Sequence, residues 1–337
     1  MIDLLIVGGG PAGLATAIHA ARAGLAVVVL EPRPAPIDKA CGEALMPAAV
    51  LALAELGVAV EGHPLRGIRY LDARRQAEAL FRAGPGLGVR RTALHQALSW
   101  RAAELGVPVL PLKAGPVRQD GHSVTAAGLT ARYLVAADGL HSPIRRALAL
   151  DRPDPRPPRY GLRRHFALAP WTDCVEVHWA ARSEAYVTPV GPGLTGVAVL
   201  TGDRAPFPEQ LAAFPALAAR LREASAGPVR GAGPLRRPVS ARVAGRVLLV
   251  GDAAGYLDAL TGEGISLALA TAAHLVRCVA ADRPHAYERA WRQASRRHRL
   301  LTGSLLAIRS HPQAARRIVP AAALLPPVFA ALVNRLG

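Results

Sequence analysis

The first 31 residues alternate between strand, turn, helix and strand, and this order constrains the fold more than any other feature of the chain. An apolar run over residues 3–7 leads into Gly8-Gly9-Gly10-Pro11-Ala12-Gly13, and a second apolar run, Val27–Leu30, ends at Glu31. In a dinucleotide-binding unit of this order, the free N–H groups at the helix start face a pyrophosphate. An acid roughly 20 residues past the turn can accept hydrogen bonds from a ribose. The segment therefore predicts a nucleotide-binding α/β fold.

The glycines of this turn have different expected roles. Gly8 permits the tight turn, Gly10 keeps side chains away from the pyrophosphate, and Gly13 lets the helix lie close to the strand. A glycine-rich turn without a ligand is the alternative, and the two flanking strands and Glu31 argue against it. The predicted cofactor contacts in this region are Gly8, Gly10, Pro11, Ala12, Gly13, Glu31, Pro32 and Arg33.

Composition limits the class of protein. With 337 residues, 51% of them hydrophobic, the chain can bury a sizeable core in two domains or in one elaborated domain. The net charge of +17 comes mostly from arginine, but no compact basic block is interleaved with aromatic residues, so we expect no nucleic-acid partner. Cys41, Cys174 and Cys278 form no C-x-x-C pair, so neither a metal site nor a disulfide is expected. The strand that starts at residue 2 leaves no room for a signal peptide, which favours a cytoplasmic protein.

The rest of the chain contains further helix and strand patterns. Periodicity predicts helices at residues 48–56, 92–105, 207–224, 265–281 and 285–308. Stretches at 160–167, 174–179, 184–189 and 195–200 predict an antiparallel sheet, and residues 67–81 predict a hairpin.

Two further motifs place an acid at the end of an apolar strand. The first is Ala137-Asp138-Gly139, and the second is Gly251-Asp252-Ala253-Ala254-Gly255, followed by Gly262-Glu263-Gly264. Each aspartate has an ordinary structural alternative, a turn residue for Asp138 and a helix N-cap for Asp252. Capping can coexist with ligand binding.

The N-terminal turn and these two motifs together resemble those of an FAD-dependent family. That family contains p-hydroxybenzoate hydroxylase-type monooxygenases, flavin halogenases and geranylgeranyl reductases, and the resemblance covers residues 2–275. It implies an α/β fold with a Rossmann-like FAD-binding domain, an antiparallel β-sheet substrate domain and C-terminal helices. We assign residues 1–64, 84–152 and 241–282 to the FAD-binding domain, 65–83 and 153–240 to the substrate domain, and 283–337 to the C-terminal helical region.

The resemblance also implies roles for residues around the cofactor. Arg91 would reach the phosphate or ribityl region, and Asp252 would accept hydrogen bonds from ribityl hydroxyls. Asp138 and Gly139 would couple the flavin region to a reduced nicotinamide. Gly262-Glu263-Gly264 opens a helix near Ile265, whose N-terminus would stabilise an anionic reduced flavin, with Glu263 pointing away. Because no second dinucleotide motif is present, NAD(P)H is expected as a transient electron donor.

Two segments favour the geranylgeranyl reductase branch of the family. Gly255 stands where aromatic hydroxylases often have histidine, and Lys39-Ala40-Cys41-Gly42 is similar to a stretch near the flavin of the reductases. Cys41 and Gly42 therefore join the predicted cofactor contacts. Cys41 can lie beside the isoalloxazine or can be a buried small hydrophobic residue, and both interpretations stay open.

Two enzymatic functions fit this resemblance. The first is an NAD(P)H-driven monooxygenase that hydroxylates or epoxidises an aromatic, polyketide or lipophilic phenol- or quinone-type substrate through a flavin hydroperoxide. The second is a geranylgeranyl reductase-like enzyme that reduces prenyl or other C=C bonds. A flavin-binding protein without turnover is a third hypothesis, which no specific feature supports. The sequence does not distinguish NADH from NADPH, and it does not identify the substrate.

The catalytic candidates are Cys41 and four residues expected near the flavin. Period-two alternation along strands favours one shared sheet face for Arg164, His178 and Tyr186. Asp258 lies just before the Gly262 turn and is a candidate polar group near the reactive ring. A structural or surface role is the alternative for each of them.

The C-terminal region combines positive charge with an apolar end. Residues 282–317 contain nine arginines against only Asp282 and Glu288. The apolar stretch at 318–333 is interrupted by prolines and is shorter than the roughly 20 residues of a spanning helix. We expect either peripheral contact with the anionic inner membrane surface or a cover over a lipophilic substrate. A solvated helix face packed on the first domain is the alternative.

Overall fold

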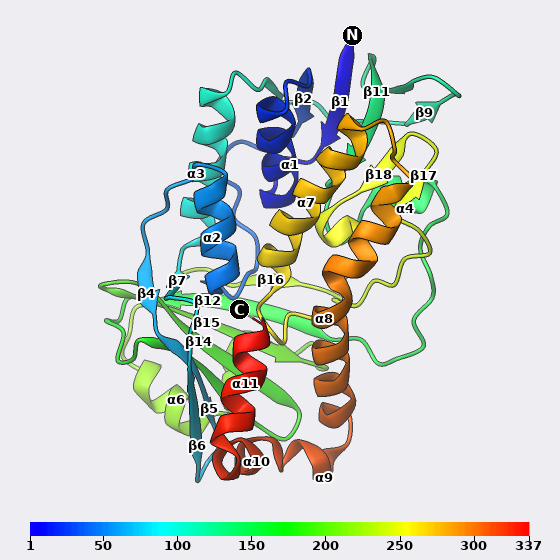
Figure 1. Cartoon of the computed structure of the whole chain (residues 1–337). Helices are drawn as coiled ribbons and strands as arrows, with labels where there is room; N and C mark the ends of the chain where they lie inside the picture. Colours follow the sequence, from blue (N-terminus) through cyan, green and yellow to red (C-terminus); the bar gives the residue numbers. More distant parts are fainter. Residues whose placement is uncertain (337) are drawn as a thin grey trace.

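The computed structural model describes residues 1–336 as two sheet-based layers and a C-terminal set of helices (Figure 1). The first sheet has eight strands in the order β17-β18-β11-β1-β2-β8, with β10 beside β11 and β9 beside β10. These strands are β1 (Ile2–Val7), β2 (Val27–Leu30), β8 (Val109–Leu110), β9 (Arg118–Gln119), β10 (Val124–Ala126), β11 (Leu129–Ala136), β17 (Val243–Ala244) and β18 (Val247–Leu249). The two apolar runs at the N-terminus form β1 and β2, which pair in parallel as predicted.

The register of this sheet brings distant motifs to one edge. Val7, the last residue of β1, pairs with Leu30 of β2 and with Ala136 of β11, and Ala136 pairs with Leu249 of β18. The four strands therefore end side by side. Because ligands of parallel sheets bind beyond the carboxyl ends of the strands, the glycine turn and the three acids that follow these strands share the expected binding edge.

Helices cover the first sheet. α1 (Pro11–Arg22) contacts both α7 (Gly264–Ala280) and α3 (Arg91–Glu104), and α2 (Pro47–Glu55) contacts α7 (Figure 1). The helices predicted at 265–281, 92–105 and 48–56 correspond to α7, α3 and α2, and each prediction is correct within one residue. The core under them is aliphatic, and Leu4, Leu5 and Ile6 of β1 are fully buried.

The second sheet has seven strands in the order β16-β12-β15-β14-β13-β5-β6. They are β5 (Gly67–Leu71), β6 (Gln76–Leu80), β12 (Tyr160–Phe166), β13 (Cys174–Trp179), β14 (Ser183–Gly191), β15 (Leu194–Thr201) and β16 (Arg230–Ala232). All neighbours are antiparallel except β5 and β13. The expectation of a purely antiparallel sheet is wrong at this pair, because a long crossover connects the two strands and only a hairpin would force them to be antiparallel. β3 (Ala44–Leu45), β7 (Gly86–Gly88) and β4 (His63–Leu65) form a third, small sheet.

The two faces of the second sheet pack differently. One face packs on α5 (Phe207–Leu211) and α6 (Pro215–Leu221). The other face packs on the C-terminal helices and on residues of the first layer. The prediction of one helix at 207–224 is wrong, because Pro215 lacks an amide hydrogen and starts a new helix.

The C-terminal helices run along both layers. α8 (Ala286–Arg309) begins beside α7 and extends past the second sheet, where α9 (Pro312–Ala315) and α10 (Ile318–Leu324) follow (Figure 1). α11 (Pro326–Leu336) then turns back along β6. Within residues 1–336, no single helix has the length and apolar character to cross a membrane, although the bent pair Pro312–Leu324 and Pro326–Arg335 meets those criteria jointly, with a bend of 104°.

Candidate active site

A cavity of about 470 Å³ lies between the carboxyl edge of the first sheet and the second sheet. Most of the predicted cofactor contacts line it, namely Gly10, Pro11, Ala12, Arg33, Cys41, Gly42, Arg91, Asp138, Gly139, Gly251, Asp252, Gly262, Gly264 and Ile265. Gly8, Gly13, Glu31, Pro32 and Glu263 lie outside its wall. Three motifs that are far apart in the sequence therefore meet at one cavity.

The glycine turn meets this cavity at Gly10. Gly8 has a φ of +108°, which side chains rarely adopt, and a Cβ there would lie 2.4 Å from the Ala137 carbonyl oxygen. A Cβ on Gly13 would lie 1.9 Å from the Gly8 carbonyl oxygen. A Cβ on Gly10 would meet only an Arg91 nitrogen, at 3.9 Å. Packing therefore requires Gly8 and Gly13, whereas Gly10 keeps space open for a ligand.

Arg91, the first residue of α3, brings a cation to Gly10. Its Nε is buried and has no hydrogen-bond partner within residues 1–336. A buried donor without a partner is costly unless a ligand satisfies it. The first amide to bond within α1 is that of Leu14, which donates to the Gly10 carbonyl at 2.9 Å, so the amides before it are available to an anion. Both groups fit a pyrophosphate.

Glu31 supports the glycine turn from behind. Its carboxylate accepts hydrogen bonds from the Gly9 amide and from Arg33 Nε, each at 2.8 Å. Burial alone would raise the pKa of Glu31, but the Arg33 side chain and the backbone donors outweigh it and lower that pKa. Pro32 is exposed, whereas Arg33 reaches the cavity wall. Glu31 therefore acts on the cavity through Gly9 and Arg33.

Lys39 and Asp252 join two motifs across the cavity. Lys39 Nζ lies 2.9 Å from Asp252 Oδ2. Burial alone would raise the pKa of Asp252, but the Lys39 ammonium outweighs it and lowers that pKa. The ionised carboxylate is a hydrogen-bond acceptor of the kind that ribityl hydroxyls need.

Asp138 is both a turn residue and part of the cavity lining. Its Oδ2 accepts a hydrogen bond from the Ile144 amide at 3.2 Å, at the start of α4 (Pro143–Ala147), which is a turn role. Its Oδ1 is buried without a partner in the described part of the chain, and the residue lines the cavity. Burial raises the pKa of Asp138.

α7 presents its N-terminus to the cavity through Gly264 and Ile265. Glu263 turns away, as expected, because its Oε2 lies 2.7 Å from Nδ1 of His298 on α8. The N-terminus of a long helix has about half a positive charge, so an anionic group would be stabilised at this wall.

Cys41 lines the cavity, which favours the interpretation that places it beside the flavin. Its sulfur accepts a hydrogen bond from the Glu43 amide at 3.4 Å. Burial raises the pKa of the Cys41 thiol. The thiol is therefore protonated at neutral pH and can donate a proton.

Sequence reasoning missed Glu43, which lines the cavity in a left-handed backbone conformation, with a φ of +61°. Its carboxylate accepts the Arg91 amide at 2.8 Å and lies 2.5 Å from His165 Nε2. Arg163 lies 2.9 Å from the other ring nitrogen, and because a guanidinium only donates, the neutral His165 donates from Nε2 to Glu43. The only sequence signal was a lone acid between Gly42 and an apolar run.

Of the three catalytic candidates predicted on the second sheet, Tyr186 is the one that lines the cavity. Tyr186 and its cross-strand partner Val177 both line it. His178, the next residue along β13, points to the opposite face, and Arg164 lies on that face too, where it donates to the Gly227 carbonyl at 2.8 Å. Arg164 and His178 therefore share a face, but the expectation that Tyr186 lies on it too is wrong. The faces of two strands are related by their register, which the spacing along one strand does not reveal.

Asp258 belongs to a buried network of charges and lies outside the cavity wall. Arg159 lies 2.9 Å from Asp258 and 2.8 Å from Glu184, and Glu184 also contacts Arg309 at the end of α8. Burial raises the pKa of Asp258, although Arg159 opposes this rise. Asp258 therefore does not line the cavity as a polar group, because it joins the segment at 256–262 to the second sheet and to α8.

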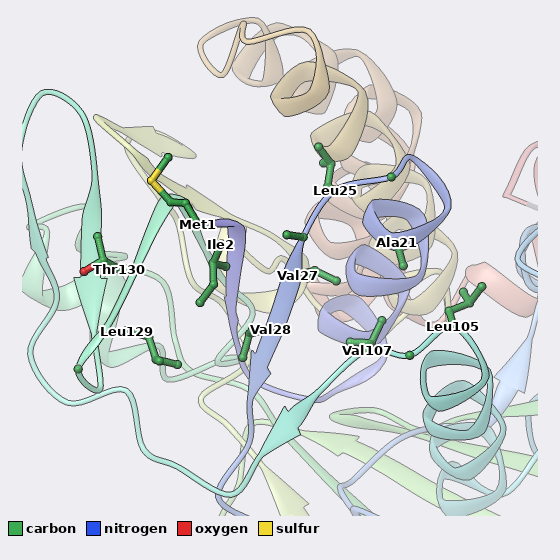
Figure 2. A pocket seen from close by; sticks show the side chains of 14 residues that line it. Met1, Ile2, Ala21, Leu25, Val27, Val28, Leu105, Val107, Leu129 and Thr130 are labelled. Carbon is green, nitrogen blue, oxygen red and sulfur yellow. The ribbon is translucent and has the colours of Figure 1, made fainter.

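A second hollow of about 780 Å³ lies at the amino ends of the first-sheet strands, where Figure 2 shows Met1, Val27 and Val107 around it. Its lining contains no charged side chain. Parallel sheets bind ligands at the carboxyl ends of their strands. We therefore assign the candidate site to the cavity at Gly10.

Comparison with known proteins shows to which family the chain belongs. A model of the FAD binding domain matches residues 1–161. Menaquinone reductase of Mycobacterium tuberculosis is 32% identical over 308 residues, which cover 80% of this chain and 74% of that protein. The chain belongs to this family of FAD-dependent oxidoreductases.

Two other known proteins resemble this oxidoreductase. Aurachin C monooxygenase/isomerase of Stigmatella aurantiaca is 28% identical over 324 residues, which cover 83% of this chain and 81% of that protein. The solved structure of a flavoprotein/dehydrogenase from Cytophaga hutchinsonii has a TM-score of 0.80 at 20% identity, and the match covers 99% of this chain and 96% of that one. The α/β flavoprotein fold implied by the motifs is confirmed.

The residues that line the cavity of this oxidoreductase suit FAD at three points. The unpartnered Arg91 Nε and the open space at Gly10 suit the pyrophosphate. Asp252 suits the ribityl hydroxyls, and the N-terminus of α7 suits the ring edge that is anionic when the flavin is reduced. Cys41 would then lie in the wall at the ring end.

Proposed function

We propose that this oxidoreductase uses FAD and NAD(P)H to reduce a carbon–carbon double bond in a lipophilic prenyl- or quinone-type substrate. The observation that carries the proposal is the apolar wall of the cavity that Cys41 also lines. It is formed by Ile68, Val175, Val177, Leu200, Leu235, Leu260 and Val333. Such a wall favours a substrate that gains free energy by leaving water. The name of the 32% identical relative, menaquinone reductase, supports the same substrate class.

Reduction of a double bond places a hydride on one carbon and a proton on the other. Bound FAD would supply the hydride in its reduced form, and oxidation of NAD(P)H would restore that form. The chain supplies the proton from the Cys41 thiol, which burial keeps neutral. Tyr186 is a second neutral group at this wall, because burial raises the pKa of its hydroxyl well above the usual value.

Glu43 and His165 position the segment that contains Cys41. The Glu43 amide contacts the Cys41 sulfur, and the Glu43 carboxylate contacts His165. The chain of contacts continues through Arg163 to Asp38, which is partly exposed. Because the Cys41 sulfur meets a backbone amide and Arg163 only donates hydrogen bonds, these contacts position Cys41, and the thiolate regains its proton from water after turnover.

A monooxygenase is the second candidate, favoured by the 28% identity to aurachin C monooxygenase/isomerase over 83% of this chain. The same water-poor cavity suits that reaction. One oxygen atom of O2 would enter the substrate, the other would leave as water, and NAD(P)H would supply two electrons.

Oxygen dependence separates the two functions. The holoprotein would be incubated with NADH or NADPH and a prenylated quinone, first without oxygen and then under labelled oxygen. Without oxygen, we expect flavin reduction and a product whose prenyl chain has gained two hydrogens. A product that forms only with oxygen and contains the label would replace the proposal with the monooxygenase.

Cys41→Ser is expected to slow substrate reduction by roughly 10²- to 10⁴-fold, because a serine hydroxyl is a far weaker acid than a thiol. Flavin content and the rate of flavin reduction by NAD(P)H should not change. Cys278→Ser, near the C-terminal end of α7 and outside the cavity lining, is the matched control and should retain full turnover. Wild-type turnover of the Cys41→Ser holoprotein would exclude the thiol as proton donor.

A further inference from the structure

An apolar elbow projects from the C-terminal helices at the junction of α10 and α11. We define the elbow as Leu324, Leu325, Val328 and Leu332, whose exposed fractions are 80%, 55%, 52% and 41%. Burying these side chains elsewhere would be favourable by the hydrophobic effect. Their exposure on adjoining turns of one helical corner marks a contact surface.

The opposite face of α11 closes the candidate active site. Phe329 and Val333 are buried, and the Phe329 ring lies 4.7 Å from the Tyr70 ring, centre to centre. Tyr70 and Val333 both line the cavity. One helix therefore separates the substrate wall from the exposed apolar elbow.

Exposed arginines flank the elbow, and Asp72 is the acid on the nearby turn between β5 and β6. Residues 310–337, which contain α9 to α11, have three arginines, Arg316, Arg317 and Arg335, and no aspartate or glutamate. Arg316 and Arg317, just before α10, are exposed, and Arg74 and Arg75 are exposed on the turn between β5 and β6. That turn lies on the same side, because α10 contacts both β5 and β6 and lies at their ends (Figure 1).

We propose that the elbow inserts into the interface of an anionic phospholipid bilayer, with the flanking arginines on the lipid headgroups. Exposed leucines beside arginines match the requirements of interfacial binding, in which apolar burial and charge attraction add. A second copy of the chain fits less well, because its own arginines would face these. The proposal rests on the proposed function in one respect: a lipophilic substrate would pass from the bilayer along α11 into the cavity.

The test measures co-sedimentation of the full-length holoprotein with vesicles of phosphatidylcholine, alone or mixed with phosphatidylglycerol. We expect binding to the mixed vesicles that salt weakens. Leu324→Glu with Leu325→Glu should reduce binding at least tenfold. Arg316→Gln with Arg317→Gln should reduce it roughly 10- to 30-fold.

The controls make changes of the same kind on the first layer, one leucine substitution and two arginine substitutions. Leu51→Glu, at a 56% exposed site, and Arg118→Gln with Arg152→Gln, at exposed sites, should bind vesicles like the wild type. All variants should retain their flavin content and circular dichroism. No binding to mixed vesicles, equal losses in the control variants, or a dimer that dissociates in the leucine variant would overturn the proposal. Vesicle binding by a protein that fails to reduce prenylated quinones would instead overturn the proposed function alone.

Discussion

A Gly10→Ala variant should fold like the wild type and lose FAD. The φ of Gly10 is −71°, which alanine adopts without strain, and its Cβ would meet no atom closer than 3.9 Å. The methyl group would stand where the pyrophosphate approaches the backbone. We expect FAD affinity to fall at least about 100-fold, equivalent to about 2.7 kcal/mol, as measured by titration of the apoprotein with FAD.

Two other glycine substitutions make this experiment specific. Gly303→Ala, inside α8 with nothing near its Cβ, should leave FAD affinity unchanged and add up to about 1 kcal/mol of stability. Gly13→Ala should destabilise the fold itself, because its Cβ would lie 1.9 Å from the Gly8 carbonyl oxygen. If the Gly10→Ala protein bound FAD with normal affinity, the pyrophosphate would have to lie elsewhere.

Glu184→Gln should lower the free energy of unfolding by about 3–5 kcal/mol, because it leaves buried arginine charge without its partner. Glu184 is fully buried and contacts both Arg159 and Arg309. These contacts join the second sheet to the end of α8. Urea unfolding of the holoprotein, followed by circular dichroism, measures the change.

A surface carboxylate provides the comparison. Glu104 is 65% exposed and lies 3.0 Å from Arg101, so Glu104→Gln should cost less than about 1 kcal/mol. If both variants lost the same free energy of unfolding, burial of Glu184 would not increase the effect of its substitution. A Glu184→Gln protein as stable as the wild type would show that the network does not hold α8 in place.

The nucleotide-binding half of the site was predictable because its signal is local. The conformations of Gly8 and Gly13 follow from one turn between a strand and a helix, and the helix at 92–105 is correct within one residue. The family motifs then located Asp252 and the start of α7. These features depend on short-range sterics and hydrogen bonds, which a short stretch of sequence encodes.

The substrate half was predictable only in part. Tyr186 reaches the cavity, whereas His178 and Arg164 face the other side, because strand register determines which residues share a face. Glu43 meets His165 across 122 residues of sequence, and no local pattern indicated that contact. Asp258 contacts Arg159 in a charge network, and this contact also joins segments that are distant in the sequence.

The sequence by itself determined the Rossmann-like unit, the FAD family and most of the helices, because each depends on residues close together in the chain. Only the tertiary structure decided which side chains face the substrate wall, that Glu43 and His165 form a pair, and that α11 covers the cavity on one face and exposes leucines on the other. These outcomes depend on how distant segments pack. Burial and strand register determine them, and both depend on the whole fold.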